Sequence, residues 1–307
     1  MKACIDIGGT KVAVSLNTGA GLDLIARRSE PTAKTGTNDA LALQVIRMVD
    51  QACAEARIEP STVQRAGVSS AGPFVLHEGL VELAAPNICG GIAGPERGLP
   101  NTWMTATLEA PLRHRFAQVR VENDCVAALE AERRWGALQG VENCAYVTWS
   151  TGVGMGFCVD GRVLRGKNGN AGHGGHMFVS DNDDALCGCG NVGDVEALVA
   201  GNAVARRFGA DAATLLQRAR AGDAAATTTV DELCRVMGRS LYNTTVMLDL
   251  QRISLGGSVF SNNQEYLLPR LQAQLAGKLP ALTDGCELVP AGLGDRVGDY
   301  AALALLV

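Results

Sequence analysis

Residues Ser150–Glu196 read STGVGMGFCVDGRVLRGKNGNAGHGGHMFVSDNDDALCGCGNVGDVE, and this stretch carries three kinds of chemistry. Its glycine-rich start, Ser150 to Gly156, leaves backbone N–H groups open to an anion because no side chain blocks the approach. Two histidines and a cysteine–acid cluster follow: His173, His176, Cys187, Cys189, Asp194 and Glu196. An imidazole, two thiolates and a carboxylate at this spacing suit a tetrahedral zinc site. The stretch therefore predicts a phosphate-binding loop joined to a metal-braced substrate pocket.

The bulk composition narrows the class of protein. The 307 residues suffice for two domains, and 47% hydrophobic with 19% charged residues is typical of a folded globular chain. A net charge of −5 and only 4% aromatic residues argue against nucleic-acid binding. The sequence shows no secretory signal and no apolar run of membrane-spanning length, and most of its ten cysteines are isolated in apolar contexts. We therefore expect a cytoplasmic protein that binds no membrane.

The N-terminal residues predict a strand, a tight turn and a second strand. Ala3 to Ile7 and Val12 to Leu16 are apolar runs, and Asp6-Ile7-Gly8-Gly9-Thr10-Lys11 joins them. Such a turn can present backbone amides, the Thr10 hydroxyl and the Lys11 ammonium to a phosphate, while Asp6 can hold Mg²⁺ through water. The alternative is a plain hairpin that uses Gly-Gly for its turn.

The rest of the first half continues the pattern of a ribonuclease-H-like domain, in which three strands, a helix and a further strand follow in order. The predicted elements are a strand from Leu22 to Arg27, a helix from Asn38 to Ala56, a strand from Arg65 to Ser69, a loop from Leu80 to Gly91 and a helix from Trp103 to Arg115. A short strand from Val119 to Val121 then ends in Glu122-Asn123-Asp124, before a helix from Cys125 to Trp135. Asn123 or Asp124 can simply cap that helix, or Asp124 can act as a general base at the strand end.

The second half predicts a similar order of elements. A strand from Cys144 to Ser150 precedes the glycine turn. Helices are expected from Val195 to Phe208, from Val230 to Leu248 and from Asp299 to Val307. A strand from Ile253 to Leu255 ends in Gly256-Gly257-Ser258, a second backbone platform. The phosphate-loop pattern, a strand followed by a glycine-rich turn, occurs at Asp6–Lys11 in the first half and at Ser150–Gly156 in the second, which favours two related halves that clamp one nucleotide.

Together these ordered motifs resemble the ROK family of sugar kinases, within the actin-like hexokinase superfamily. Asp6–Lys11 looks like the first phosphate loop of that family, Ser150–Gly156 like the second, and Leu255–Ser258 like its adenosine-side loop. The resemblance implies two ribonuclease-H-like (actin-like ATPase) domains of α/β class around a central cleft. It also implies that ATP with Mg²⁺ donates a phosphoryl group to a sugar hydroxyl, expected to be the 6-hydroxyl of a hexose such as glucose.

The resemblance assigns roles to residues of this chain. Asp124 is the implied catalytic base. The implied sugar ligands are Gly72, Asn87, Asn123, Asp124, His173, His176 and Glu196; the implied nucleotide and Mg²⁺ contacts are Asp6, Gly8, Gly9, Thr10, Lys11, Thr151, Gly152, Gly154, Gly256 and Gly257. The implied domains are residues 1–117 with about 293–307, and residues 118–292, the latter with the sugar site, the zinc loop and the adenosine side. A homodimer or homotetramer is also implied.

Two positions depart from the family pattern. The last zinc cysteine is replaced by Asp194, so the implied structural Zn²⁺ site is His176, Cys187, Cys189 and Asp194, harder and more labile than usual. The alternative is a loop that holds no metal and is closed by hydrogen bonds. His173 stands where most members carry a glutamate that binds sugar hydroxyls, so the substrate can be an atypical sugar or polyol, or His173 can replace a metal ligand. A non-catalytic sugar sensor is a further alternative; a repressor is disfavoured because only five residues precede Asp6.

Overall fold

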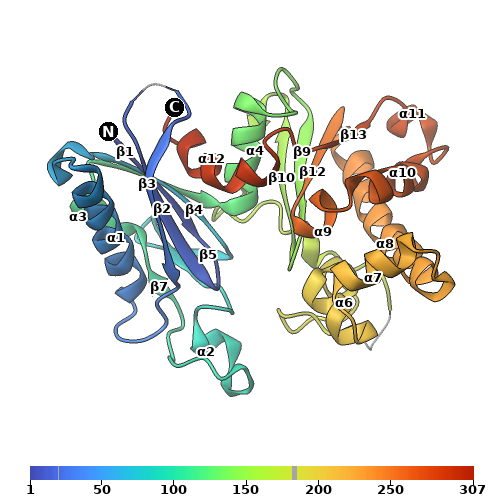
Figure 1. The fold of residues 1–307 in the computed structure, drawn as a ribbon, viewed down its shortest axis with the longest axis horizontal. Coiled ribbons are helices and arrows are strands. Elements are labelled where there is room, and N and C mark those ends of the chain that lie inside the picture. The colour runs from blue at the N-terminus through green and yellow to red at the C-terminus, as the bar shows by residue number, and fades with distance from the viewer. Residues whose placement is uncertain (20, 182–184) are drawn as a thin grey trace. The chain divides into compact units, whose positions relative to one another are not determined.

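The computed structural model describes residues 1–19, 21–181 and 185–307, which form two compact units (Figure 1). The first unit comprises residues 1–131, 165–170 and 296–307, and the second comprises residues 132–164 and 171–295. Among the described residues, no helix combines the length and the apolar character needed to cross a membrane.

The first unit is built on a five-stranded sheet with the order β3-β2-β1-β4-β8. The strands β1, β2 and β3 are antiparallel neighbours, whereas β4 and β8 continue the sheet in parallel with β1. Their bounds are β1 Lys2–Ile7, β2 Lys11–Asn17, β3 Leu24–Pro31, β4 Arg65–Ser70 and β8 Gln118–Asn123. The hairpin expected around Gly8-Gly9 is therefore confirmed.

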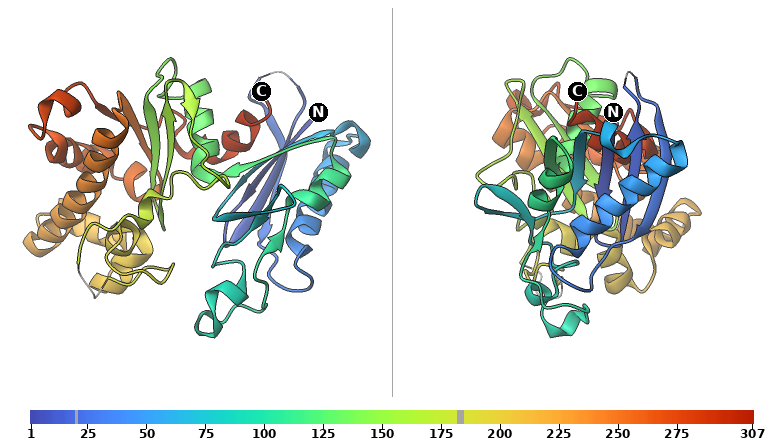
Figure 2. Two further views of the ribbon diagram at one scale, coloured as in Figure 1. Left: turned by 180° about the vertical axis from the view of Figure 1, so that it is seen from behind. Right: turned by 90° about the vertical axis from the view of Figure 1, so that its left-hand side faces the viewer.

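Helices cover both faces of this sheet, which explains the continuous burial of its central strands (Figures 1 and 2). Helix α1 (Ala40–Ala56) packs on β2 and β3 and contacts α3 (Glu109–Arg115). It turns Leu41, Val45, Met48 and Ala52 inward, at the spacing of one helix face. On the opposite face lies α12 (Val297–Ala304), against β1 and β4.

Two predictions for the first unit were wrong. The segment expected to be a loop after Leu80 instead contains strand β6 (Leu80–Leu83), which pairs with β5 (Phe74–His77) and β7 (Ala106–Thr107) in a small antiparallel sheet. A four-residue helix, α2 (Gly90–Ala93), follows. The helix expected from Trp103 begins only at Glu109, because the residues before it form β7 and pair with β6.

The second unit repeats the strand order of the first. Its sheet runs β11-β10-β9-β12-β13, again with three antiparallel neighbours followed by two parallel strands. The bounds are β9 Cys144–Trp149, β10 Val153–Val159, β11 Arg162–Val163, β12 Arg252–Gly256 and β13 Glu287–Pro290. The prediction of two related α/β halves is thus confirmed.

The helices of the second unit are α5 (Val195–Val199), α6 (Gly201–Phe208), α7 (Ala212–Arg220), α8 (Ala224–Leu248), α9 (Ser258–Ser261), α10 (Gln264–Leu275) and α11 (Pro280–Thr283). The single helix expected from Val195 to Phe208 was wrong, because Ala200 is extended and Gly201 donates its N–H to the Ser150 carbonyl at 2.8 Å. The glycine turn is also shorter than expected, since β10 already begins at Val153.

The expected domain ranges differ from the units that contacts define. Strand β8 pairs with β4 along its whole length, so residues 118–123 belong to the first sheet rather than to the second domain. Helix α4 (Asp124–Trp135) follows β8 and remains in the first unit as far as Ala131. Residues 165–170 also pack in the first unit, although their neighbours in sequence belong to the second.

Candidate active site

The parallel strands of the first unit bring several candidate residues to one edge of the sheet. In register, Asp6 of β1 lies beside Ser69 of β4, and Ser69 lies beside Glu122 of β8. The next step along the strands reaches Asn123, directly before Asp124. The carboxyl ends of parallel strands are the usual location of ligand sites in α/β folds.

Asp6 has a perturbed acidity. Burial raises its pKa to about 6, the negative charge of Asp124 contributes in the same direction, and Lys11 opposes both. The Ser69 hydroxyl donates a long hydrogen bond of 3.4 Å to Asp6 Oδ1. The negative charges of Asp6 and Asp124 repel each other, and a cation bound beside them would offset this repulsion.

The first glycine turn is closed by local bonds and by close packing. The Gly8 N–H donates to the Lys11 carbonyl at 2.9 Å, and the Thr32 hydroxyl donates to the Gly8 carbonyl at 2.7 Å. A Cβ atom on Gly9 would collide with the side-chain amide of Asn87. The structure therefore brings a candidate phosphate-loop residue and a candidate sugar ligand into contact, and only glycine fits between them.

The junction of β8 and α4 carries the candidate base. The Cys125 N–H donates to Asn123 Oδ1 at 3.0 Å and to Asp124 Oδ1 at 2.8 Å. Asn123 directly precedes helix α4, and Cys125 is the second residue of that helix. The bond from Cys125 to Asn123 is therefore that of an N-cap residue. Capping is therefore compatible with a second role for the half-buried Asp124 in the first turn.

In the second unit, Glu196 braces the other glycine turn. Its Oε2 accepts the N–H of Val153 at 2.9 Å, and a Cβ on Gly152 would lie 2.7 Å from the same oxygen. The turn itself is closed by the Ser150 N–H, which donates to the Gly152 carbonyl at 2.9 Å. Gly154 lies within β10, opposite Thr148 of β9. Glu196 thus couples the turn at Thr151 and Gly152 to the start of α5.

Four predicted metal ligands converge in the second unit. The ligand atoms of His176, Cys187, Cys189 and Asp194 lie within 4.8 Å of one another. His176 Nδ1 is 3.2 Å from Asp194 Oδ2 and 3.6 Å from Cys187 Sγ, and Cys189 Sγ is 3.5 Å from Asp194 Oδ2. Zinc–ligand bonds of about 2.0–2.3 Å in a tetrahedron give ligand–ligand separations of about 3.3–3.8 Å. The donor set and its spacing therefore fit Zn²⁺.

The pKa values of His176, Cys187 and Asp194 are all shifted from their usual ranges. The hydrogen bond to Asp194 raises the pKa of His176 against the effect of burial, and burial raises the pKa of the Cys187 thiol. Burial opposes ionisation of Asp194, but its bonds to His176 and to the Ala197 amide outweigh that effect and lower its pKa. A metal cation would favour the deprotonated forms of both His176 and Cys187.

His173 lies beside this group and is not one of its four members. Its ring centroid is 6.2 Å from that of His176, with 26° between the ring planes. The loop that carries both rings is held against β10, because Cβ atoms on Gly174 and Gly175 would collide with Met155 and Val153. The close packing of these glycines holds His176 at the end of a short 3₁₀ turn, Gly174–His176, and His173 directly before that turn.

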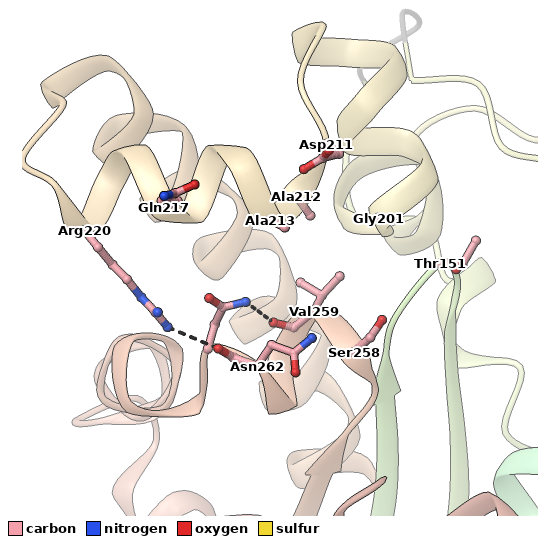
Figure 3. Close-up of a pocket in the computed structure, with 11 residues that line it drawn as sticks. Thr151, Gly201, Asp211, Ala212, Ala213, Gln217, Arg220, Ser258, Val259 and Asn262 are labelled. Carbon is pink, nitrogen blue, oxygen red and sulfur yellow. Dashed lines mark hydrogen bonds between the residues drawn. The ribbon is translucent and has the colours of Figure 1, made fainter.

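A pocket of about 470 Å³ opens beside the second glycine turn (Figure 3). It is lined by Thr151, Gly201, Asp211, Ala212, Ala213, Gln217, Arg220, Ser258, Val259, Asn262 and Asn263. Thr151 and Arg220 lie at opposite sides of it, and Arg220 donates to the Asn262 carbonyl at 3.4 Å. An elongated ligand could therefore place one end at the glycine turn and the other at the guanidinium.

The Gly256-Gly257 turn directly precedes two residues that line this pocket. Gly257 has φ of +86°, and a Cβ there would lie 2.6 Å from Thr148 Oγ1. The turn is thus pressed onto the end of β9, and α9 starts directly after it with two pocket residues, Ser258 and Val259.

Sequence reasoning missed most of the pocket lining. Asp211, Gln217 and Arg220 lie on or next to α7, and Asn262 follows α9. Helical residues that face a pocket carry no local motif, so the sequence offered no signal beyond the nearby Gly256-Gly257. In the structure Asp211 caps α7, since its Oδ1 accepts the Thr214 amide at 2.7 Å.

Comparisons with known proteins give a consistent result. The ROK family profile matches residues 2–307. The chain is 30% identical to a glucokinase of Aeropyrum pernix, over 98% of this chain and 95% of that protein. It is 35% identical to an N-acetylmannosamine kinase of Salmonella typhimurium, over 83% and 82%. It resembles the crystal structure of a ROK family glucokinase from Streptomyces griseus in complex with glucose and AMPPNP, with a TM-score of 0.70, 25% identity and coverage of 98% and 97%.

Proposed function

This chain belongs to the ROK family, and on that premise we propose that it phosphorylates a hexose such as glucose on the 6-hydroxyl, with Asp124 as the general base. The general activity follows from the relatives: the chain is an ATP-dependent carbohydrate kinase with the actin-like two-unit fold. The observation that carries the proposal is the position of Asp124 at the carboxyl end of β8, in the same sheet as Asp6.

Asp124 would accept the proton of the attacking sugar hydroxyl. As that oxygen forms its bond to the γ-phosphorus, the bond from phosphorus to the β–γ bridging oxygen breaks, and ADP carries away the electron pair. A carboxylate at the first turn of a helix, with one oxygen held by the Cys125 amide, is oriented for this transfer before substrate binds.

The nucleotide would be bound by backbone groups of the glycine turns. Gly8, Gly9 and Thr10 with Lys11 in the first unit, and Thr151, Gly152 and Gly154 in the second, are the proposed phosphate contacts. The pocket beside Thr151 and the Gly256-Gly257 turn has a volume suited to adenosine. Asp6 is the residue that would hold Mg²⁺, through water, since a cation beside Asp6 and Asp124 offsets their mutual repulsion. That ion would supply neutralisation of phosphate charge.

The sugar ligands remain those expected from the family. Gly72, Asn87 and Asn123 belong to the first unit, and His173, His176 and Glu196 belong to the second. Because His176 Nδ1 faces the metal group, its Nε2 is the ring nitrogen available for a sugar hydroxyl. Glu196 Oε2 accepts the Val153 N–H, and Oε1 accepts the Cys187 thiol at 3.8 Å. If Cys187 binds zinc as a thiolate, that bond is lost and Oε1 would be the oxygen that contacts the sugar.

Zinc is proposed as a structural ion, held by His176, Cys187, Cys189 and Asp194. It would fix the loop that carries His176 and the start of α5 with Glu196, and would take no part in phosphoryl transfer. A reducing compartment would keep both cysteines available as thiolate ligands, so a cytoplasmic location is part of the proposal. A homodimer or homotetramer stays a proposal that rests on the family resemblance, and sedimentation would measure it.

His173 supports a second candidate, a kinase for an atypical sugar or polyol. An imidazole beside His176 offers a single acceptor nitrogen, whereas a carboxylate offers two oxygens. A sugar whose hydroxyls need fewer acceptors at this position would then be preferred over glucose. A sensor that binds sugar without turnover is the remaining alternative.

The proposal is tested by release of ADP from Mg²⁺·ATP over a sugar panel: glucose, mannose, fructose, N-acetylmannosamine, allose, glucosamine and myo-inositol. Turnover of an aldohexose, with the phosphate placed on the 6-oxygen by ³¹P NMR, would support it. Asp124→Asn should lower kcat by at least about a hundredfold while sugar and ATP still bind. Turnover of the polyol alone would favour the second candidate, and binding without turnover would favour the sensor.

A further inference from the structure

Six residues of the chain leave the second unit and pack in the first. Residues 165–170, here called the strap, follow β11 and precede the loop with His173 and His176. The side chain at each end of the strap, Arg165 and Asn170, is an anchor. The partners of these anchors lie on or next to the elements that carry the candidate catalytic and sugar-binding residues of the first unit. No sequence motif or family role described above assigns a function to these anchors.

The first anchor, Arg165, joins the strand and the helix on either side of Asp124. Its Nε lies 2.6 Å from Oε1 of Glu122 on β8, and its Nη2 lies 3.2 Å from Oε1 of Glu130 on α4. The Glu122 and Glu130 side chains are 9% and 16% exposed, so water screens these pairs less than it screens surface pairs. One planar guanidinium therefore links β8 to α4 across the position of Asp124, while Arg120 shares Glu122 Oε1 at 3.4 Å.

The second anchor, Asn170, holds the turn that follows Gly72. Its Oδ1 accepts the N–H of Phe74 at 2.7 Å, and its Nδ2 donates to the carbonyl of Phe74 at 2.7 Å. The two short bonds satisfy both backbone groups of one residue, as a neighbouring strand would. Phe74 lies two residues beyond Gly72, so a side-chain amide sets the position of that turn.

We propose that Arg165 and Asn170 are positioning residues for phosphoryl transfer: Arg165 aligns Asp124, and Asn170 aligns the turn of Gly72 toward the sugar. The inference rests on the proposed function. The Arg165 side chain is 37% exposed, but its partners Glu122 and Glu130 are only 9% and 16% exposed, so the loss of Arg165 also costs stability. A shift of about 1 Å in a catalytic group can lower the rate about a hundredfold, so we expect the two anchors to affect rate and sugar affinity beyond their effect on folding.

The kinetic test compares Arg165→Met with Arg47→Met. Arg47 forms a two-bond pair with Glu30 in the same unit, on α1 and β3 and away from the candidate site, and serves as the matched control. Arg165→Met should lower kcat by at least about tenfold with KM for ATP unchanged, and Arg165→Lys should restore part of the loss. Asn170→Ala should raise KM for the sugar while KM for ATP stays constant. Equal effects of Arg165→Met and Arg47→Met on kcat, or loss of activity only in proportion to loss of stability, would overturn the inference.

A second measurement does not depend on turnover. The Cys125 amide is accepted by Asn123 and Asp124, so its hydrogen exchange reports the geometry of the β8–α4 junction. Exchange of this amide should accelerate at least about tenfold in Arg165→Met and stay unchanged in Arg47→Met. Unchanged exchange in Arg165→Met would refute the positioning role of Arg165 even in an active enzyme. Wild-type protein that turns over no sugar would instead refute the proposed function, and the exchange result would still decide this inference.

Discussion

Replacement of Asp6 by Asn should stabilise the first unit at the expense of activity. Burial and the charge of Asp124 raise the pKa of Asp6 from 3.8 to about 6. A raised carboxyl pKa means that the ionised form is disfavoured in the folded state. The stability that the protonated form supplies is fully present below pH 3.8 and is lost as the pH rises through about 6. Asn keeps the shape of Asp6 and removes the charge.

The pKa values give the size of the effect. The rise in the pKa of Asp6 from 3.8 to about 6 corresponds to about 3 kcal/mol at pH 8, where Asp6 is ionised in both states. The same two values leave about 1 kcal/mol at pH 4.5. Because Asp6 is half-buried rather than fully enclosed, these figures are upper limits.

Hydrogen exchange of the slowest amides in β1 and β4 measures the opening free energy of the first unit directly. Asp6→Asn should slow this exchange by up to about 150-fold at pH 8 and by up to about sixfold at pH 4.5, relative to wild type at the same pH. Amides of β9 and β12 in the second unit provide an internal reference. Asp23→Asn, which removes an exposed carboxylate from the same unit, is the matched control. The account of Asp6 would be refuted if Asp6→Asn slowed exchange no more at pH 8 than at pH 4.5, or no more than Asp23→Asn does.

Three further predictions concern the second unit. Asp194→Cys should slow the loss of zinc to a chelator by at least about tenfold, because the variant adds a thiolate ligand. The metal-free variant should be less stable by about 1 kcal/mol, because the N-cap bond from the Ala197 amide is lost. Equal rates of zinc release from variant and wild type would argue against Asp194 as a ligand. Glu132→Gln should destabilise the second unit by about 1–3 kcal/mol, as measured by hydrogen exchange of the β12 amides. The buried Glu132 carboxylate accepts four hydrogen bonds, some of which the amide nitrogen of Gln cannot accept; the donors are Ala137, Ser254, Gly292 and Leu293. Glu142→Gln, at an exposed position, is the control. Ala213→Trp should fill the pocket beside Thr151 and raise KM for ATP at least about tenfold with KM for the sugar unchanged; an unchanged KM for ATP would place the nucleotide elsewhere.

The spacing of apolar residues in the sequence predicted the strands that are buried along their whole length and the helices that are buried on one face. The hairpin β1–β2, helix α1 and strand β4 all have apolar spacing that matches one period, and glycines mark the turns where backbone packs against side chains such as Asn87. The convergence of His176, Cys187, Cys189 and Asp194 was also predictable, because these ligand-type residues lie within a sequence separation of eighteen, short enough to meet at one ion. Its occupancy by zinc stays a prediction.

Elements that depend on distant partners were not predictable. The break between α5 and α6 comes from the Ser150 carbonyl, which binds the Gly201 amide across about fifty residues of sequence. The β5–β6–β7 sheet is made of strands of two to four residues, too short for alternation to be recognised. Arg165 and Asn170 read as ordinary loop residues, because only the folded chain places them against Glu122 and Phe74.

The contribution of residues 296–307 to the first unit has a consequence for biosynthesis. Helix α12 lies on β1 and β4 so closely that a Cβ on Gly67 would collide with the Ala302 carbonyl, and Leu303, Leu305 and Leu306 are almost fully buried. Nascent domains usually fold in the order in which they leave the ribosome. Here the unit that emerges first must wait, with one face of its sheet uncovered, until the whole of the second unit has been translated. We therefore expect the earlier-synthesised half to be the later one to mature, and to be the half that chaperones protect during translation.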